Sequence, residues 1–224
     1  MNACQTGKSL IAGLALFVFP LHGSHARDFY SANENPASSN RIRPGFHAVE
    51  RLGFTIGGNT ISRLARADGT IREISAGGLY QVGLGALYQW AALPLSAALT
   101  INYHYDSDYN SNDNASFRRN PLEALVYFNG LNPFRIGGGM RYIYAARADS
   151  TINGVTEKIR FENAKGSIVE IGYQVTPYGW VNLRYVKEKY YVMSYTTSGG
   201  TGPGLSGNAP YDGSHFGLFI TYEY

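Results

Sequence analysis

Hydrophobic and polar residues alternate with a period of two along most of the chain beyond residue 45, and this pattern predicts β-strands. Within 95–106, for example, Leu99 and Ile101 fall on one face while Thr100 and Asn102 fall on the other. A strand separates two such sets completely, whereas a helix would scatter both around its axis. The same test predicts eight strands, at roughly 46–65, 70–90, 95–108, 119–130, 134–148, 166–175, 180–195 and 213–224.

The connections between these segments alternate in length. Those at 91–94, 131–133 and 176–179 are short and contain proline, as tight turns do. The intervening ones begin with a hairpin signal at Asp68-Gly69 and are otherwise longer and polar, at 111–116, 149–165 and 197–211. Bacterial transmembrane barrels have short periplasmic turns, long external loops and both termini in the periplasm. The pattern therefore predicts an all-β, eight-stranded antiparallel up-and-down transmembrane barrel over 45–224.

The apolar face of these strands is rich in tyrosine and tryptophan, which is typical of the aromatic girdles at the two membrane interfaces. The expected girdle residues are Tyr80, Tyr88, Trp90, Tyr103, Tyr105, Tyr142, Tyr144, Tyr222 and Tyr224. The opposite face mixes glycine with charged residues and would enclose them. The expected lumen residues are Arg51, Glu123, Arg135, Arg141, Arg147, Glu170, Arg184, Glu188 and Glu223. A secreted β-sandwich or lipocalin-type barrel, with the apolar face inward, is the alternative.

The first 26 residues have the layout of a secretory signal peptide. Lys8 precedes an apolar run at 10–21, and Ser24-His25-Ala26 follows it. The run is too short to span a bilayer, which takes about 20 apolar residues; a short N-terminal membrane anchor is the alternative. The polar segment 27–44 is predicted to be a periplasmic arm. The one cysteine, Cys4, would leave with the signal, which excludes a disulfide scaffold.

The composition of the chain excludes some classes of protein. A formal net charge of +3 is too small for a nucleic-acid-binding protein, and 44% hydrophobic residues is too high for a disordered chain. No motif for a cofactor or a metal is present. We expect an exported, monomeric outer-membrane protein whose surroundings are lipid and lipopolysaccharide.

The chain resembles the small eight-stranded outer-membrane barrels of the OmpA transmembrane-domain and OmpX type. The resemblance rests on the architecture, on GYQVTPYGWVNLRY at 172–185 and on the final strand HFGLFITYEY. That ending is similar to the C-terminal assembly signal of such proteins, which implies recognition by the outer-membrane assembly machinery. Members of the family often end in phenylalanine, whereas this chain ends in Tyr224. The resemblance also implies an Arg–Glu network that plugs the lumen.

Eight strands enclose a space that side chains can fill, and charges in such a space must be paired. We therefore expect a structural or surface-interaction role rather than general diffusion, with a narrow porin-like channel as the alternative. Lys187 and Lys189 continue the lipid-facing side of their strand. Either a bulge near Val186 turns them, or they lie at the outer rim beside lipopolysaccharide phosphates; we favour the rim.

A lipid-modifying outer-membrane enzyme is the third alternative, because such enzymes use serine and histidine. After the signal peptide the histidines are His47, His104 and His215. His104 lies near Asp106 and Ser107, and His215 lies near Asp212 and Ser214, but no G-x-S-x-G motif accompanies them. The run 106–114 offers oxygen ligands for calcium without the spacing of an EF-hand. We expect polar strand ends and solvated loops, with no catalytic, cofactor or metal residues.

Overall fold

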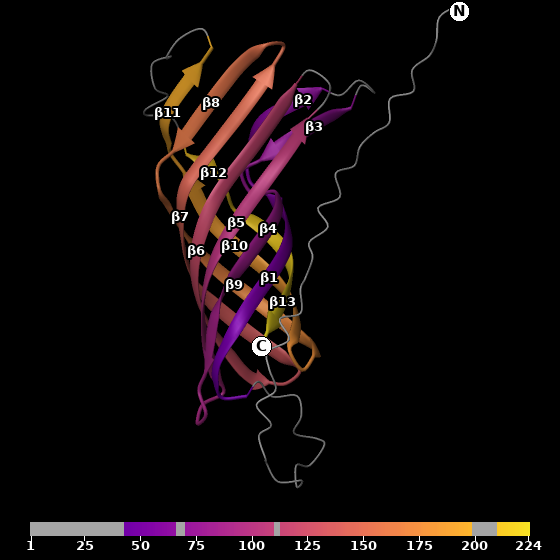
Figure 1. Ribbon diagram of the computed structural model, residues 1–224, viewed down its shortest axis with the longest axis vertical. Coiled ribbons are helices and arrows are strands. Elements are labelled where there is room, and N and C mark those ends of the chain that lie inside the picture. The colour runs from indigo at the N-terminus through magenta and orange to yellow at the C-terminus, as the bar shows by residue number, and fades with distance from the viewer. Residues whose placement is uncertain (1–42, 66–69, 110–112, 199–209) are drawn as a thin grey trace, which may run out of the picture. The chain divides into compact units, whose positions relative to one another are not determined.

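A computed structural model describes residues 43–65, 70–109, 113–198 and 210–224, all within one compact unit, and every regular element in them is a β-strand (Figure 1). The predicted signal peptide and residues 27–42 of the predicted arm lie outside the described residues. None of the described residues belongs to a helix that could span a membrane. The strands are β1 (Gly45–Gly57), β2 (Thr60–Ala65), β3 (Ile71–Ser75), β4 (Leu79–Gln89), β5 (Leu95–Tyr109), β6 (Asn114–Leu131), β7 (Phe134–Ile152), β8 (Val155–Phe161), β9 (Ala164–Thr176), β10 (Gly179–Tyr190), β11 (Val192–Thr197), β12 (Tyr211–Asp212) and β13 (His215–Glu223).

Eight of these strands close into a barrel. Antiparallel pairing runs from β1 through β4, β5, β6, β7, β9, β10 and β13 and returns from β13 to β1. Each strand therefore pairs with its neighbours on both sides, and no edge remains around the ring. This confirms the predicted eight-stranded antiparallel barrel.

The barrel wall is inverted relative to a soluble protein. Along β13, Phe219 and Thr221 are buried in the interior, while Leu218 and Ile220 are exposed on the outside. The same holds on β4, where Leu84 is 66% exposed. Because neighbouring side chains on a strand point to opposite faces, the period-two sequence pattern produces an apolar outer surface and a polar interior.

The two ends of the barrel differ. The short connections 90–94, 132–133 and 177–178 lie at the end where β1 begins and β13 ends, which we call the turn end. The opposite end, which we call the extended end, carries β2, β3, β8, β11 and β12 (Figure 1). The alternation of short and long connections thus follows the sequence prediction.

The predicted strands 46–65 and 70–90 are each divided, because the chain leaves the barrel wall and forms the β2–β3 hairpin. Gly57 and Gly58 have φ of 127° and 79°, which favours glycine. A Cβ on Gly58 would lie 2.5 Å from the backbone nitrogen of Gly77, so the two backbones pass where a larger residue would not fit. The Asp68-Gly69 turn itself lies outside the described residues, but the strands that flank it pair antiparallel.

The predicted loop 149–165 is instead mostly strand. β7 extends to Ile152, and β8 returns alongside it after a two-residue turn at Asn153 and Gly154. Both turn residues have positive φ, 51° and 77°, and Asn-Gly is the preferred sequence for such a hairpin. The predicted strand 180–195 ends at Tyr190, and β11 then pairs with β8 rather than with the barrel. The two other predicted loops are also partly strand: β6 already begins at Asn114, within 111–116, and β11 reaches Thr197, the first residue of 197–211.

An apolar cluster fills the interior at the extended end, and we call it the apolar cap. Leu64 and Ile74 reach it from the β2–β3 hairpin, and three aromatic residues meet there. The ring centroids of Phe117 and Phe161 are 5.6 Å apart, and those of Phe117 and Tyr190 are 5.7 Å apart. The barrel therefore has a water-excluding core above its polar lumen.

Candidate functional site: the polar lumen

The lumen holds a dense set of buried charges. Eight of the nine residues that the sequence assigned to it are at most 4% exposed, namely Arg51, Glu123, Arg135, Arg141, Glu170, Arg184, Glu188 and Glu223. They come from six of the eight barrel strands, namely β1, β6, β7, β9, β10 and β13. Alternation along each strand points them inward, so that residues far apart in sequence meet across the barrel.

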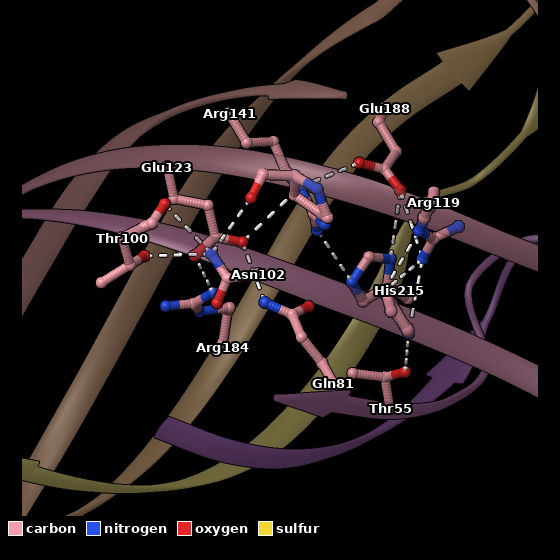
Figure 2. A network of polar contacts seen from close by, with 12 residues as sticks. Thr55, Gln81, Thr100, Asn102, Arg119, Glu123, Arg141, Arg184, Glu188 and His215 are labelled. Carbon is pink, nitrogen blue, oxygen red and sulfur yellow. Dashed lines mark hydrogen bonds and ion pairs between the residues drawn. The ribbon is translucent and has the colours of Figure 1, made fainter. Parts of the chain in front are cut away.

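Glu123 on β6 lies at the centre of this network (Figure 2). Its carboxylate is 2.7 Å from the Arg184 guanidinium, 3.4 Å from that of Arg51 and 3.6 Å from that of Arg141. The side-chain amide of Gln81 donates a further hydrogen bond to it at 3.0 Å. One carboxylate thus bridges three cations from three other strands.

Glu170 on β9 forms the second bridge. Arg184 donates a charge-assisted hydrogen bond to it from Nε at 2.7 Å, and its Nη2 lies 2.6 Å from the same carboxylate oxygen as an ion pair. The Tyr127 hydroxyl donates to the same carboxylate at 3.0 Å and accepts from Arg51 at 2.8 Å. The network is therefore continuous across the barrel rather than a set of separate pairs.

Arg135 closes the network toward the turn end. It contacts Glu223 at 2.5 Å and Asn182 at 3.1 Å. Its guanidinium lies 4.1 Å from the centroid of the Trp180 ring and 4.2 Å from that of Tyr127, so it is held between two aromatic faces. The Arg135 guanidinium is thus stabilised by a carboxylate, an amide oxygen and two aromatic rings together.

Glu188 closes the network toward the extended end. It lies 3.4 Å from Arg141 and 3.5 Å from Arg119 (Figure 2). It also accepts a hydrogen bond of 2.6 Å from Tyr190. Tyr190 also belongs to the apolar cap. Polar network and cap are therefore in direct contact.

Arg147 is the exception, and its predicted position in the lumen is wrong. A bulge at Ala145, with φ of 55°, shifts the register between β6 and β7, so residues beyond it reverse their facing. Ala146 and Ala148 are buried instead, and Arg147 is half-buried on the outer side. Sequence reasoning also missed Arg119, which is 1% exposed. Counting back by two from Glu123 reaches Arg119, so the alternation held that signal, whereas nothing in the sequence marks the bulge.

The buried histidines are engaged by the network. His104 contacts the Thr55 hydroxyl at 2.8 Å and Arg119 at 2.7 Å. His215 contacts the carbonyl of Gly213 at 2.7 Å. Asp106 is directed away from His104: it accepts from the backbone N–H of Ser75 and pairs with Arg72 at 3.4 Å.

The third histidine lies at the turn end, and a serine lies near His215. His47 is bonded to backbone oxygens. The Ser214 hydroxyl accepts from the backbone N–H of Glu188. Hydrogen bonds from the hydroxyl and then the backbone N–H of Ser214 lower the pKa of Asp212. No group of three metal-ligating side chains gathers anywhere in the described segments.

The residues expected in the aromatic girdles all face outward and form two groups. Toward the turn end lie Tyr88, Trp90, Tyr222 and Tyr224, and toward the extended end lie Tyr80, Tyr103, Tyr105, Tyr142 and Tyr144. Aliphatic side chains such as Leu84, Leu99 and Leu218 occupy the surface between them. Lys187 and Lys189 continue outward along β10 without a bulge at Val186, which agrees with a place at the rim.

A pocket of about 400 Å³ opens at the turn end. It is lined by amide side chains, among them Gln89, Asn129 and Gln174, and by Trp180. Asn129 donates to Gln89 at 2.8 Å, and Gln174 donates to a backbone oxygen, so these amides brace the turns. The ring of Trp180, which lines this pocket, is the same ring that the Arg135 guanidinium contacts.

Comparison with known proteins supports the fold. No protein-family model and no curated protein matches the chain. Among solved structures, the attachment invasion locus protein Ail of Yersinia pestis matches 81% of this chain and 100% of its own, at 9% identity and a TM-score of 0.50. The chain has the fold of a small outer-membrane barrel.

Two further solved structures cover a similar share of this chain. Neisserial surface protein A covers 80% of this chain and 97% of its own, at 13% identity and a TM-score of 0.48. A major outer membrane protein from Thermus thermophilus covers 80% and 99%, at 13% identity and a TM-score of 0.46.

Proposed function

We propose that the protein is an integral, monomeric outer-membrane barrel with a closed lumen and a structural or surface-interaction role. The proposal rests on one observation: apolar side chains are exposed on the outside of the barrel, while a network of ion pairs is buried inside it. Only a hydrocarbon surrounding makes this inversion favourable, because the exposed aliphatic and aromatic surface would otherwise face water. The turn end then faces the periplasm and the extended end faces outward.

Two layers of side chains along the barrel axis, the Arg–Glu network and the apolar cap, support the closed lumen. An ion could cross only if Arg184 separated from Glu123 and Glu170 and the apolar cap also opened. In a low-dielectric interior each such separation leaves a buried charge without its partner, which is energetically costly. The narrow-channel alternative would need these contacts to break and re-form under voltage.

Planar-bilayer recording tests the closed lumen. We expect the wild-type barrel to give no stable, large conductance. The matched control is the double variant Glu170→Ala with Arg184→Ala. It opens a gap in the lumen, and because both members of the ion pair are removed, neither remains as an unpaired charge. A stable, large conductance of the wild type would overturn the proposal, and a small, stable one would favour the narrow channel.

We propose a non-catalytic role, because the buried histidine candidates are engaged elsewhere. His104 and His215 are enclosed by arginines, and Asp106 does not orient either of them. A lipid A mass shift on overexpression of the wild-type chain, absent for His104→Gln, would indicate an enzyme instead. Recognition by the assembly machinery through β13 is part of the same proposal, and deletion of β13 is expected to prevent insertion.

A further inference from the structure

Three arginines from adjacent strands form a row on the outer face of the extended end. The register places Arg118 of β6 opposite Arg147 of β7, and Arg147 opposite Arg160 of β8. Their sequence neighbours Phe117 and Phe161 are buried in the apolar cap. Because side chains alternate along a strand, the three arginines point outward.

The bulge at Ala145 creates this row. Without it, the alternation from Arg141 would carry Arg147 into the lumen. The bulge instead places Arg147 on the same outer side as Tyr142 and Tyr144, just beyond these aromatic residues on β7. A position immediately beyond an aromatic girdle is the level of the lipid headgroups.

The row brings positive charges together on three neighbouring strands. Side chains directly opposite each other on neighbouring strands have Cβ atoms about 5 Å apart, where like charges repel. Arg118 is paired with Asp149 at 3.0 Å. Among the described residues, Arg147 and Arg160 form no ion pair. An anion between them would remove the repulsion.

The chemistry of the row selects phosphate. Guanidinium groups are planar forks that bind two phosphate oxygens at once, which an ammonium cannot do. We propose that Arg118, Arg147 and Arg160 bind phosphate groups of anionic lipid in the outer leaflet. This inference rests on the proposed membrane function, which places the row at headgroup level.

Lipid retention by the folded full-length barrel tests the proposal. The protein is mixed with zwitterionic detergent micelles that contain bisphosphorylated lipid A, and the lipid A molecules retained are counted by native mass spectrometry. We expect Arg147→Gln to weaken retention about fivefold and the triple Gln variant to weaken it further, as for loss of basic residues near an anionic surface. Arg63→Gln is the matched control, because Arg63 is an exposed arginine of β2 that pairs with Glu73.

The outcomes are distinct. Retention by Arg147→Gln equal to wild type, or an equal loss in Arg63→Gln, would overturn the inference. So would equal retention of dephosphorylated lipid A, or displacement by millimolar inorganic phosphate, which would indicate a site for the bare anion. Insertion is measured separately, by protease protection in phosphatidylcholine vesicles that lack lipid A. Failure to insert would refute the membrane function as well, whereas an inserted barrel that does not retain lipid A would refute only the arginine row.

Discussion

Replacement of Glu123 by glutamine tests whether the lumen network holds the barrel together. The amide keeps the shape of the side chain but removes the charge that bridges three guanidinium groups at 2.7, 3.4 and 3.6 Å. Glu123 is fully buried, so water cannot replace the lost charge. Arg184 and Arg51 would still share Glu170, and Arg141 would keep Glu188. We therefore expect the free energy of unfolding to fall by about 3–5 kcal/mol, the usual cost of breaking a buried ion pair.

The assay is urea unfolding in phosphatidylcholine vesicles, followed by tryptophan fluorescence. Glu73→Gln is the control, since Glu73 pairs with Arg63 at the exposed surface and is expected to change stability by about 1 kcal/mol or less. Adding Arg184→Met to Glu123→Gln is expected to cost less than the sum of the two single changes, because the partners are removed together. A loss under about 1 kcal/mol for Glu123→Gln, or strict additivity, would refute the reasoning.

Two further changes test the placement of side chains by the same unfolding assay. Arg141→Gln removes ion pairs to two buried glutamates and is expected to lower the free energy of unfolding by about 3 kcal/mol. Arg147 lies outside the lumen, so Arg147→Gln is expected to stay within about 0.5 kcal/mol of wild type. Equal losses of stability would mean that both arginines lie on the same side of the barrel wall. Phe117→Ala empties the middle of the apolar cap and is expected to cost about 3–5 kcal/mol and to expose the β2–β3 hairpin to limited proteolysis. An unchanged cleavage pattern would contradict the role of the cap.

The barrel was predictable from the sequence because its period-two signal is repeated in every wall strand. Inward and outward sets alternate throughout β13 and along all but the last residues of β5 and β9, so one pattern specifies both the strand and the side of each residue. The short turns carried a second, independent signal. Together they define the barrel and the inward side of Glu123 and Arg184.

The extended end was not predictable in the same way. There the strands leave the ring, Gly57 and Gly58 adopt positive φ, and a bulge at Ala145 shifts the register of β7 against β6. The period-two count along the sequence does not register a bulge, but in the structure the bulge reverses the facing of the residues that follow it. Arg147 was therefore assigned to the wrong side. The Asn153-Gly154 turn was a readable hairpin signal that the polar composition of 149–165 concealed.

The apolar cap restricts how the external connections can change over evolutionary time. It is assembled from the β2–β3 hairpin, from the prolonged β6 and β7, and from β8, so these segments share one interior. An insertion or replacement in one of them would leave the others with unmatched surfaces. The external segments of this barrel must therefore diversify as a group, and sequence variation that is tolerated singly is confined to positions that point away from Phe117 and its neighbours.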